Sequence, residues 1–241
     1  MALHLKKHPI PEQEPTVRAQ NFDEVALGYD EETAVAEAER CLHCKVPLCR
    51  QGCPVGVDIP RFIDRIKVRD YAGAIAVIKE TNALPAVCGR VCPQENQCEK
   101  NCVLAKRGEA VAIGRLERFA ADWDLAREQT IPPITYADDA QRVAVIGAGP
   151  AGLSAAGELA RRGYRVTVFE ALHTAGGVLS YGIPEFRLPK EAIVEKEIES
   201  LKALGVAIEL NTVVGQLYTV DELLTEEGFD AVFVGTGAGL P

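Results

Sequence analysis

Residues 143–160 read VAVIGAGPAGLSAAGELA, in which an apolar run is followed by a glycine-rich turn and a second apolar run. We predict a buried strand over residues 142–146, a helix over residues 153–162 and a second strand over residues 165–169. This succession is typical of an α/β domain with a parallel sheet. The glycines and the proline within the stretch argue against a transmembrane span.

The turn between the first strand and the helix has the spacing G-x-G-x-x-G of a dinucleotide-binding loop. Gly147 would allow the tight turn, Gly149 would let the backbone approach a pyrophosphate, and Gly152 would let helix and strand pack closely. The start of the helix would offer N–H groups and a positive dipole end to that pyrophosphate. The alternative is a glycine turn that holds no ligand.

An acidic residue, Glu170, ends the second strand, where a carboxylate can accept hydrogen bonds from ribose hydroxyls. Its charge disfavours a 2′-phosphate, so the site suits FAD or NAD rather than NADP. Gly176 and Gly177 follow soon after, and residues 235–237 form a second glycine turn after a strand predicted over residues 229–234. Both glycine features favour FAD.

All eight cysteines lie before this domain, in residues 41–54 (CLHCKVPLCRQGCP) and residues 88–102 (CGRVCPQENQCEKNC). The opening C-x2-C and the Cys-Pro pair in both stretches are typical of bacterial two-cluster iron–sulfur proteins, in which the cysteine before the proline often serves the other cluster. Four cysteines in each stretch would also complete one zinc site each. Disulfides are a third possibility, disfavoured because residues 1–15 lack an apolar signal-peptide core and so predict a reducing, cytoplasmic location.

The overall composition limits the possible classes of protein only loosely. The chain has 241 residues and is 47% hydrophobic, enough for one large or two ordinary domains with a core. Its formal net charge of -9 gives no indication of nucleic-acid binding. We therefore predict a cytoplasmic protein with neither a nucleic-acid partner nor a membrane partner.

We divide the chain into a polar leader (1–30), a helical iron–sulfur domain (31–130), a linker (131–141) and an FAD-binding domain (142–241). Apolar spacing predicts helices in the second part over residues 31–40, 59–68, 71–79 and 114–128. Asp58, followed by Pro60, is the predicted N-cap of the helix over residues 59–68.

Several motifs together resemble a known family: GCPVGVDIPRFI, ALPAVCGRVCPQENQCEKNC, VAVIGAGPAGLSAAGELA, GGVLSYGIPEFRLPK and AVFVGTGAGLP. They resemble the small-subunit family of bacterial glutamate synthase, and within it most closely the large subunit of NADH-dependent reduced ferredoxin:NADP oxidoreductase. The amino-terminal half of dihydropyrimidine dehydrogenase is similar in layout. The resemblance implies an α-helical ferredoxin-like domain with two 4Fe–4S clusters, followed by an α/β FAD-binding Rossmann-type domain that is incomplete at its C-terminus.

The resemblance also implies the ligands of both clusters. The first cluster would be held by Cys41, Cys44, Cys49 and Cys102. The second would be held by Cys53, Cys92, Cys98 and Glu117, with Cys88 as a bystander thiol. On the residues alone, two alternatives stand beside this assignment: Glu117 as a solvated helix carboxylate, and Cys88 as a ligand.

For the flavin, the family pattern falls on residues of the glycine loop and of the segments that follow it. These are Gly147, Gly149, Pro150, Ala151, Gly152, Glu170, Gly177, Val178, Arg187 and Val213. Val213 could equally be a plain strand residue, and Arg187 a surface cation.

The chain ends at Pro241, where the resemblance implies a following NADPH-binding domain, so we expect a fragment or a split subunit, with NADP(H) bound only in the intact enzyme. The implied function is that of a flavin and iron–sulfur oxidoreductase subunit, in which electrons pass between FAD, reduced by NAD(P)H, and the clusters without a catalytic side chain. The implied partner is the glutamate synthase large subunit or a ferredoxin-linked flavoprotein subunit. The alternatives are a non-catalytic electron relay within a larger complex and a zinc-stapled adapter that holds nucleotide.

Overall fold

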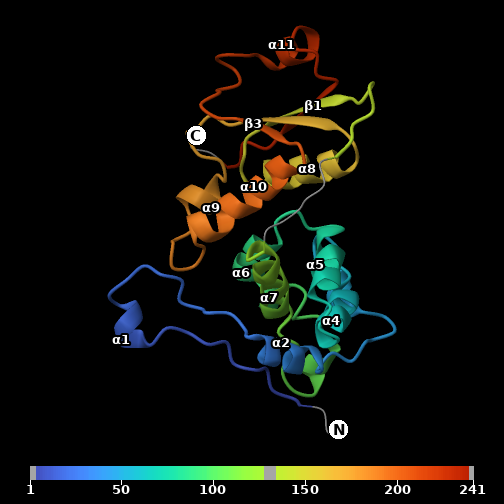
Figure 1. Cartoon of the computed structure of the whole chain (residues 1–241), viewed down its shortest axis with the longest axis vertical. Coiled ribbons are helices and arrows are strands. Elements are labelled where there is room, and N and C mark those ends of the chain that lie inside the picture. Colours follow the sequence, from blue (N-terminus) through green and yellow to red (C-terminus); the bar gives the residue numbers. More distant parts are fainter. Residues whose placement is uncertain (1–3, 128–133, 239–241) are drawn as a thin grey trace. The chain divides into compact units, whose positions relative to one another are not determined.

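The computed structural model describes residues 4–127 and 134–238, which divide into two compact units (Figure 1). The first unit comprises residues 4–127 together with Glu185–Pro189, and the second comprises residues 134–184 and 190–238. The predicted linker, residues 131–141, therefore lies partly outside the described residues. The structure joins the predicted leader to the first unit, and it adds to that unit a short segment from within the predicted FAD-binding domain.

The first unit is helical, with short loops at both cysteine stretches. Its α-helices are α1 (Pro15–Arg18), α2 (Glu31–Ala38), α3 (Leu48–Gln51), α4 (Ile59–Lys67), α5 (Tyr71–Lys79), α6 (Pro85–Val91) and α7 (Ile113–Leu125). Two 3-10 turns, Gln94–Asn96 and Val103–Lys106, complete it. The four predicted helices are confirmed as α2, α4, α5 and α7, whereas α6 was not predicted because its cysteine and glycine obscure the periodicity.

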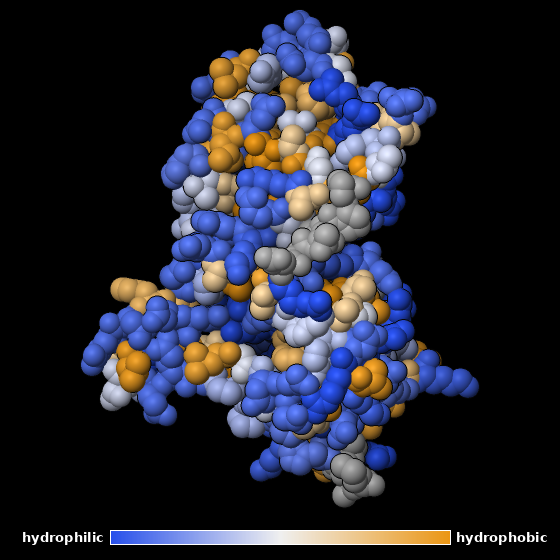
Figure 2. Space-filling view, in the orientation of Figure 1, coloured by the Kyte–Doolittle hydropathy of each residue, from blue (hydrophilic) through white to orange (hydrophobic). Residues whose placement is uncertain are grey.

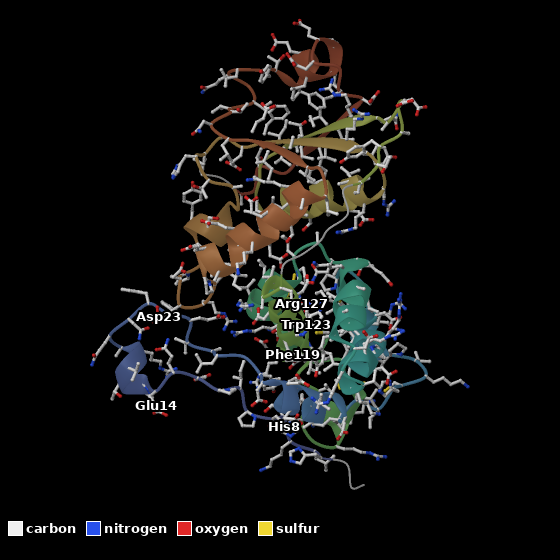
Figure 3. All side chains as sticks on the ribbon, viewed as in Figure 1. His8, Glu14, Asp23, Phe119, Trp123 and Arg127 are labelled. Carbon is white, nitrogen blue, oxygen red and sulfur yellow. The ribbon has the colours of Figure 1, made fainter. Side chains whose placement is uncertain are left out.

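Helices α4 and α7 show how the core of this unit forms. The apolar face of α4, formed by Ile59, Phe62, Ile63 and Ile66, is fully buried. On α7, Phe119 and Trp123 lie one turn apart (Figure 3), and both rings meet the edge of Tyr71 on α5, at centroid distances of 5.1 and 5.7 Å. Such edge-to-face contacts add to the burial of apolar area.

One glycine allows α6 and α7 to cross closely, and a second packs α7 against the turn that follows α6. A Cβ on Gly89 of α6 would lie 2.6 Å from the Cα of Arg118, and one on Gly114 of α7 would lie 2.3 Å from the side chain of Gln94. Any larger residue at Gly89 would push the two helix backbones apart. This crossing brings the second cysteine stretch against the middle of α7.

A buried ion pair ties the amino-terminal residues to the helices. Glu37 and Arg40 of α2 are 0% and 1% exposed and are joined at 2.5 Å. The Glu37 carboxylate also accepts hydrogen bonds from the backbone N–H groups of His8, at 2.9 Å, and Ala112, at 2.8 Å. The Arg40 guanidinium donates to four backbone carbonyls, those of His4, Leu5, Glu109 and Ala110. The hydrogen bonds to water that these two charged groups lose on burial are thus replaced by hydrogen bonds within the protein, which is why the charges can be buried.

The second unit is built on a parallel four-stranded sheet with the order β3-β2-β1-β4. The strands are β1 (Arg142–Ile146), β2 (Arg165–Phe169), β3 (Ala207–Glu209) and β4 (Ala231–Val234). The helical segments are α8 (Pro150–Arg161), α9 (Val178–Tyr181), a π-helical turn (Lys190–Glu195), α10 (Lys196–Ala203) and α11 (Val220–Thr225). The chain adds strands to one side of β1 and then crosses to the other, and ligands of open α/β sheets bind at such a switch point.

Both faces of this sheet carry apolar residues. Helix α8 packs on β1 and β2, and on the other face Phe169 meets Phe229 edge to face at 5.7 Å above a cluster that includes Leu223 of α11. Hydrophobic residues also remain at the surface of this unit (Figure 2), among them Phe233 and Val234 of β4. No helix in the two described ranges is long and apolar enough to cross a membrane.

One local prediction needs correction. Asp58 does stand at the N-cap position of α4, but its side chain makes no capping hydrogen bond. It lies instead 3.6 Å from Arg50 of α3, within the first cysteine stretch. The proline at the start of α4 removes an N–H group that a cap would otherwise have to satisfy.

We predict that Glu37→Ala destabilises the first unit by about 3–5 kcal/mol, because it leaves the buried guanidinium of Arg40 without its counter-charge. The exposed neighbour Glu39 offers a matched control, and Glu39→Ala should change the free energy of unfolding by less than about 0.5 kcal/mol. The measurement is anaerobic urea unfolding followed by the fluorescence of Trp123, the single tryptophan of the chain. Equal unfolding midpoints for the two variants would contradict the role assigned to the ion pair.

Candidate functional site

The first candidate site is a small apolar cavity that gathers cysteines from both stretches. Cys41, Cys44 and Cys49 of the first stretch line it together with Cys102 of the second. The rest of the lining is apolar. It comes from α3, α4, the turn after Cys102 and the start of α7 with the residues just before it, and it includes Leu48, Ile59, Ile63, Leu104, Val111 and Ile113. The structure therefore brings together the four residues predicted to hold the first cluster.

The electrostatics of this cavity indicate a need for positive charge. Burial raises the pKa of the Cys41 thiol, and it raises that of Cys49 to about 12. The thiolates of the group raise each other's pKa further, with Cys102 and Cys44 acting on both. Thiolate is the ligand form of cysteine, so these side chains would ionise together only around a cation that compensates their charge. The donor set thus fits a metal cluster.

The second candidate group comes from the loop after α3, from α6 and the turn after it, and from α7. Burial raises the pKa of Cys98, and the negative charges of Glu99, Glu117 and Cys53 raise it further. A hydrogen bond from Cys88 lowers the pKa of Cys92 to about 7. The residues predicted to hold the second cluster are thus electrostatic neighbours.

Cys88 belongs to the same neighbourhood. Its pKa is raised, first by its hydrogen bond to Cys92 one helical turn away, then by burial and by the Glu117 carboxylate. Its thiol also lies 3.6 Å from the Oδ1 atom of Asn82, whose Nδ2 donates to Glu117 Oε1 at 2.8 Å. Glu117 is therefore no solvated helix carboxylate, whereas the choice between Glu117 and Cys88 as ligand stays a prediction.

All eight cysteines are free thiols. Within residues 4–127 and 134–238, no three His, Cys, Asp or Glu side chains approach closely enough to hold a single metal ion.

In the second unit, the glycine loop has the conformation that its spacing predicted. Gly147 has φ +99°, and a Cβ there would lie 2.6 Å from the carbonyl oxygen of Gly235. A Cβ on Gly152 would lie 1.8 Å from the carbonyl oxygen of Gly147. Gly149 differs, because a Cβ built on it meets nothing within 4 Å. Two glycines therefore permit close backbone packing, and the third faces open space at the start of α8, where a pyrophosphate could approach.

The carboxylate of Glu170 is held beside this loop. It is 7% exposed and accepts hydrogen bonds from the backbone N–H groups of Ala148, at 2.7 Å, and Leu172, at 2.9 Å. A carboxylate has about four acceptor positions, so two bonds leave capacity for ribose hydroxyls. The side chain is thus pre-positioned next to the loop, as a nucleotide ribose requires.

A cavity of about 730 Å³ joins these parts. Of the predicted flavin contacts, the following line it: Gly147, Gly149, Pro150, Ala151, Glu170, Gly177, Val178 and Val213. Gly152 does not line the cavity and packs instead against the carbonyl of Gly147. The second glycine turn, residues 235–237, closes another part of the wall.

Arg187 is placed elsewhere. It is exposed and belongs with Glu185–Pro189 to the first unit, where the carbonyl of Phe186 accepts a hydrogen bond from the N–H of Val25 at 3.0 Å. There it lines a cavity with Arg90, Arg115 and Arg118. Its role as a flavin contact stays a prediction.

Sequence reasoning missed some residues of these sites. Phe169 and Thr212 line the nucleotide cavity, the latter because its N–H bonds to the carbonyl of Glu170 at 2.8 Å. Asn82 contacts both Glu117 and Cys88. No local pattern marks Thr212 or Asn82, because their partners Glu170 and Glu117 lie far away in the sequence.

Comparison with known families agrees with this division. Residues 18–129 match the family described as dihydropyrimidine dehydrogenase domain II, 4Fe-4S cluster. Residues 145–199 match the family described as NAD(P)-binding Rossmann-like domain.

Among curated proteins, the chain is 41% identical over 227 residues to the NAD-dependent dihydropyrimidine dehydrogenase subunit PreT of Escherichia coli, covering 92% of this chain and 54% of that protein. It is 37% identical over 235 residues to the glutamate synthase [NADPH] small chain of the same bacterium, covering 98% and 49%. It is 44% identical over 210 residues to the NADP(+)-dependent formate dehydrogenase subunit beta of Moorella thermoacetica, covering 78% and 29%.

The chain spans about half, or less, of the length of these relatives. The finer resemblance to ferredoxin:NADP oxidoreductase stays a prediction. The chain therefore belongs to the glutamate synthase small-subunit family of oxidoreductase subunits, as its motifs indicated, with a 4Fe–4S domain followed by a Rossmann-like nucleotide-binding region.

Proposed function

We propose that this chain is the iron–sulfur and FAD-binding part of an electron-transfer oxidoreductase, in which electrons pass between FAD and two 4Fe–4S clusters. The observation that carries the proposal is the gathering of Cys41, Cys44, Cys49 and Cys102 in one apolar cavity, within a domain of a 4Fe–4S family. Cys49 and Cys102, which are 53 residues apart in the chain, meet there. The unit is rich in loops, and bound clusters would hold such a unit together.

We assign the first cluster to these four cysteines and the second to Cys53, Cys92, Cys98 and Glu117. Bound clusters would supply one-electron carriers, and bound FAD a carrier that also exchanges electron pairs. The protein's own task is to bind and orient. The thiolates hold iron, the apolar residues around the first group limit the access of water, and neither site needs a catalytic acid or base.

In the second unit, we propose that the pyrophosphate of FAD lies at the start of α8 and that Glu170 binds the adenosine ribose. The open space at Gly149 and the two unused acceptor positions of Glu170 support this placement. The other residues that line the cavity would enclose the cofactor, with Val213 near the adenine. Arg187 does not line this cavity, and its contact with the flavin is proposed from the family resemblance alone.

The relatives suggest what surrounds this chain in the working enzyme. Two of them are named as NADPH- or NADP(+)-dependent and three as subunits or a small chain. We propose that NAD(P)H reduces the flavin in the intact enzyme, and that a redox partner subunit exchanges electrons with the clusters. Eight free thiols suit a reducing compartment such as the cytoplasm.

The first test is metal content. Protein made and purified without air should hold iron and acid-labile sulfide at about eight of each per chain, as two 4Fe–4S clusters require. Cys44→Ser should reduce the iron content, because it removes a ligand from the first group, whereas Cys88→Ser should not. Stoichiometric zinc with little iron would instead support the zinc-stapled alternative.

The second test concerns the fourth ligand of the second cluster. Glu117→Ala should remove about one iron or change the electron paramagnetic resonance signal of that cluster, because an iron without its protein ligand is labile. Cys88→Ser should retain both reduced signals. Glu95→Ala should retain them too, because it removes an exposed carboxylate from the turn between Cys92 and Cys98. Loss of a signal in Cys88→Ser with an unchanged Glu117→Ala would reverse the assignment.

The third test concerns FAD. Glu170→Arg should weaken FAD binding at least about tenfold, because it replaces a charged acceptor of the ribose hydroxyls by a cation. Glu209→Arg places the same charge at the exposed end of the neighbouring strand and should bind FAD normally. Both affinities follow from titration of flavin fluorescence, with the iron content as a check on folding. A wild-type chain that binds NAD but no FAD would favour the electron-relay alternative.

A further inference from the structure

Asn82, in the short connection between α5 and α6, makes three contacts that meet at the second cysteine group. The residue is 5% exposed. Its Nδ2 atom donates to Glu117 Oε1 at 2.8 Å, and its Oδ1 atom accepts from the backbone N–H of Leu84 at 3.0 Å. The sulfur of Cys88 lies 3.6 Å from the same Oδ1 atom.

The backbone contact determines which way the amide faces. Leu84 is the N-cap of α6, and its N–H can donate only to the oxygen of the Asn82 side chain. The NH₂ group must then point in the opposite direction, toward α7 and Glu117. The start of α6 thus fixes the orientation of the Asn82 amide, and the amide in turn donates a hydrogen bond to Glu117 on α7.

The two candidates for the fourth ligand therefore meet opposite ends of one amide. The N–H end holds the Glu117 carboxylate in one orientation beside the second cysteine group. The oxygen end lies 3.6 Å from the Cys88 sulfur, where a ligand thiolate would meet the partial negative charge of the amide oxygen. The same side chain favours ligation by Glu117 and disfavours ligation by Cys88.

From this geometry we infer that Asn82 is a positioning residue that selects Glu117, rather than Cys88, as the fourth protein ligand of the second cluster. The inference rests on the proposed function, because it presumes a cluster held by Cys53, Cys92 and Cys98. Asn82 would bind no iron itself. It would act through the carboxylate that it orients, as second-sphere groups at metal sites commonly do.

The test uses Asn82→Asp, which keeps the oxygen that Leu84 needs but replaces the donor by an acceptor. In this variant Glu117 should leave the iron and Cys88 should take its place. The iron content should stay unchanged, while the electron paramagnetic resonance signal and the midpoint potential of the second cluster shift. The double variant Asn82→Asp/Cys88→Ser has neither ligand in place, so it should lose about one iron per chain and show a three-iron signal when oxidised.

Two controls separate orientation from charge. Asn82→Ala removes the donor without adding charge, and its spectrum should match that of Asn82→Asp if the amide donor is what matters. Asn21→Asp adds the same charge in the amino-terminal segment and should leave both signals as in the wild type. A spectral change in Asn82→Asp with none in Asn82→Ala would show an electrostatic effect alone and would overturn the inference.

The remaining outcomes separate this inference from the proposed function. If Glu117→Ala changes the second signal while Asn82→Asp and Asn82→Ala both match the wild type, Asn82 has no positioning role and the cluster assignment stands. If Glu117→Ala also matches the wild type, or if the wild type has no second cluster, the assignment of Glu117 fails and the inference fails with it.

Discussion

The close crossing of α6 and α7 is the constraint on which the iron–sulfur unit depends. Gly89 leaves no room for a Cβ against Arg118, and Gly114 leaves none against Gln94. Because the backbones touch at Gly89, Cys88 on α6 and Cys92 directly after it come next to Glu117 on α7. A single methyl group at Gly89 would force the helices apart and would separate the proposed ligands of the second cluster, whose positions must hold to a fraction of an ångström.

The nucleotide-binding unit also depends on glycines that let backbone segments pack closely. The carbonyls of Gly147 and Gly235 occupy positions where a Cβ on Gly152 or Gly147 would otherwise lie, so the loop, α8 and the turn after β4 pack as backbone against backbone. Of the three glycines in the loop's motif, Gly149 faces open space. The same short motif therefore contains residues that close the packing and one that leaves a place for a ligand, and Glu170 is tied to the loop by the N–H of Ala148.

The two units treat charge in different ways. In the first, negative groups are collected where a metal would compensate them: burial raises the pKa of Cys41, Cys49 and Cys98, and these thiols become ligands only around a cation. In the second, a helix start and backbone N–H groups face the cavity where the phosphates of a dinucleotide would lie. On the proposed assignment, the anionic thiolates would be compensated by metal in one unit, and the anionic cofactor by backbone dipoles in the other.

The sequence by itself determined the order of the two domains, the helices with clear apolar spacing and the glycine loop, because each of these depends on contacts between residues close together in the chain. It also indicated the family, through motifs that are themselves local. The family motifs also indicated that Cys102 joins Cys41, Cys44 and Cys49, and the structure places these four around one cavity. Only the tertiary structure decided that Glu37 and Arg40 anchor the amino-terminal residues and that Asn82 meets Glu117. These contacts join segments separated by up to about 70 residues, and no local periodicity or spacing records them. The placement of Glu185–Pro189 with the iron–sulfur unit is of the same kind, since a hydrogen bond to Val25, and not its own sequence, holds that segment there.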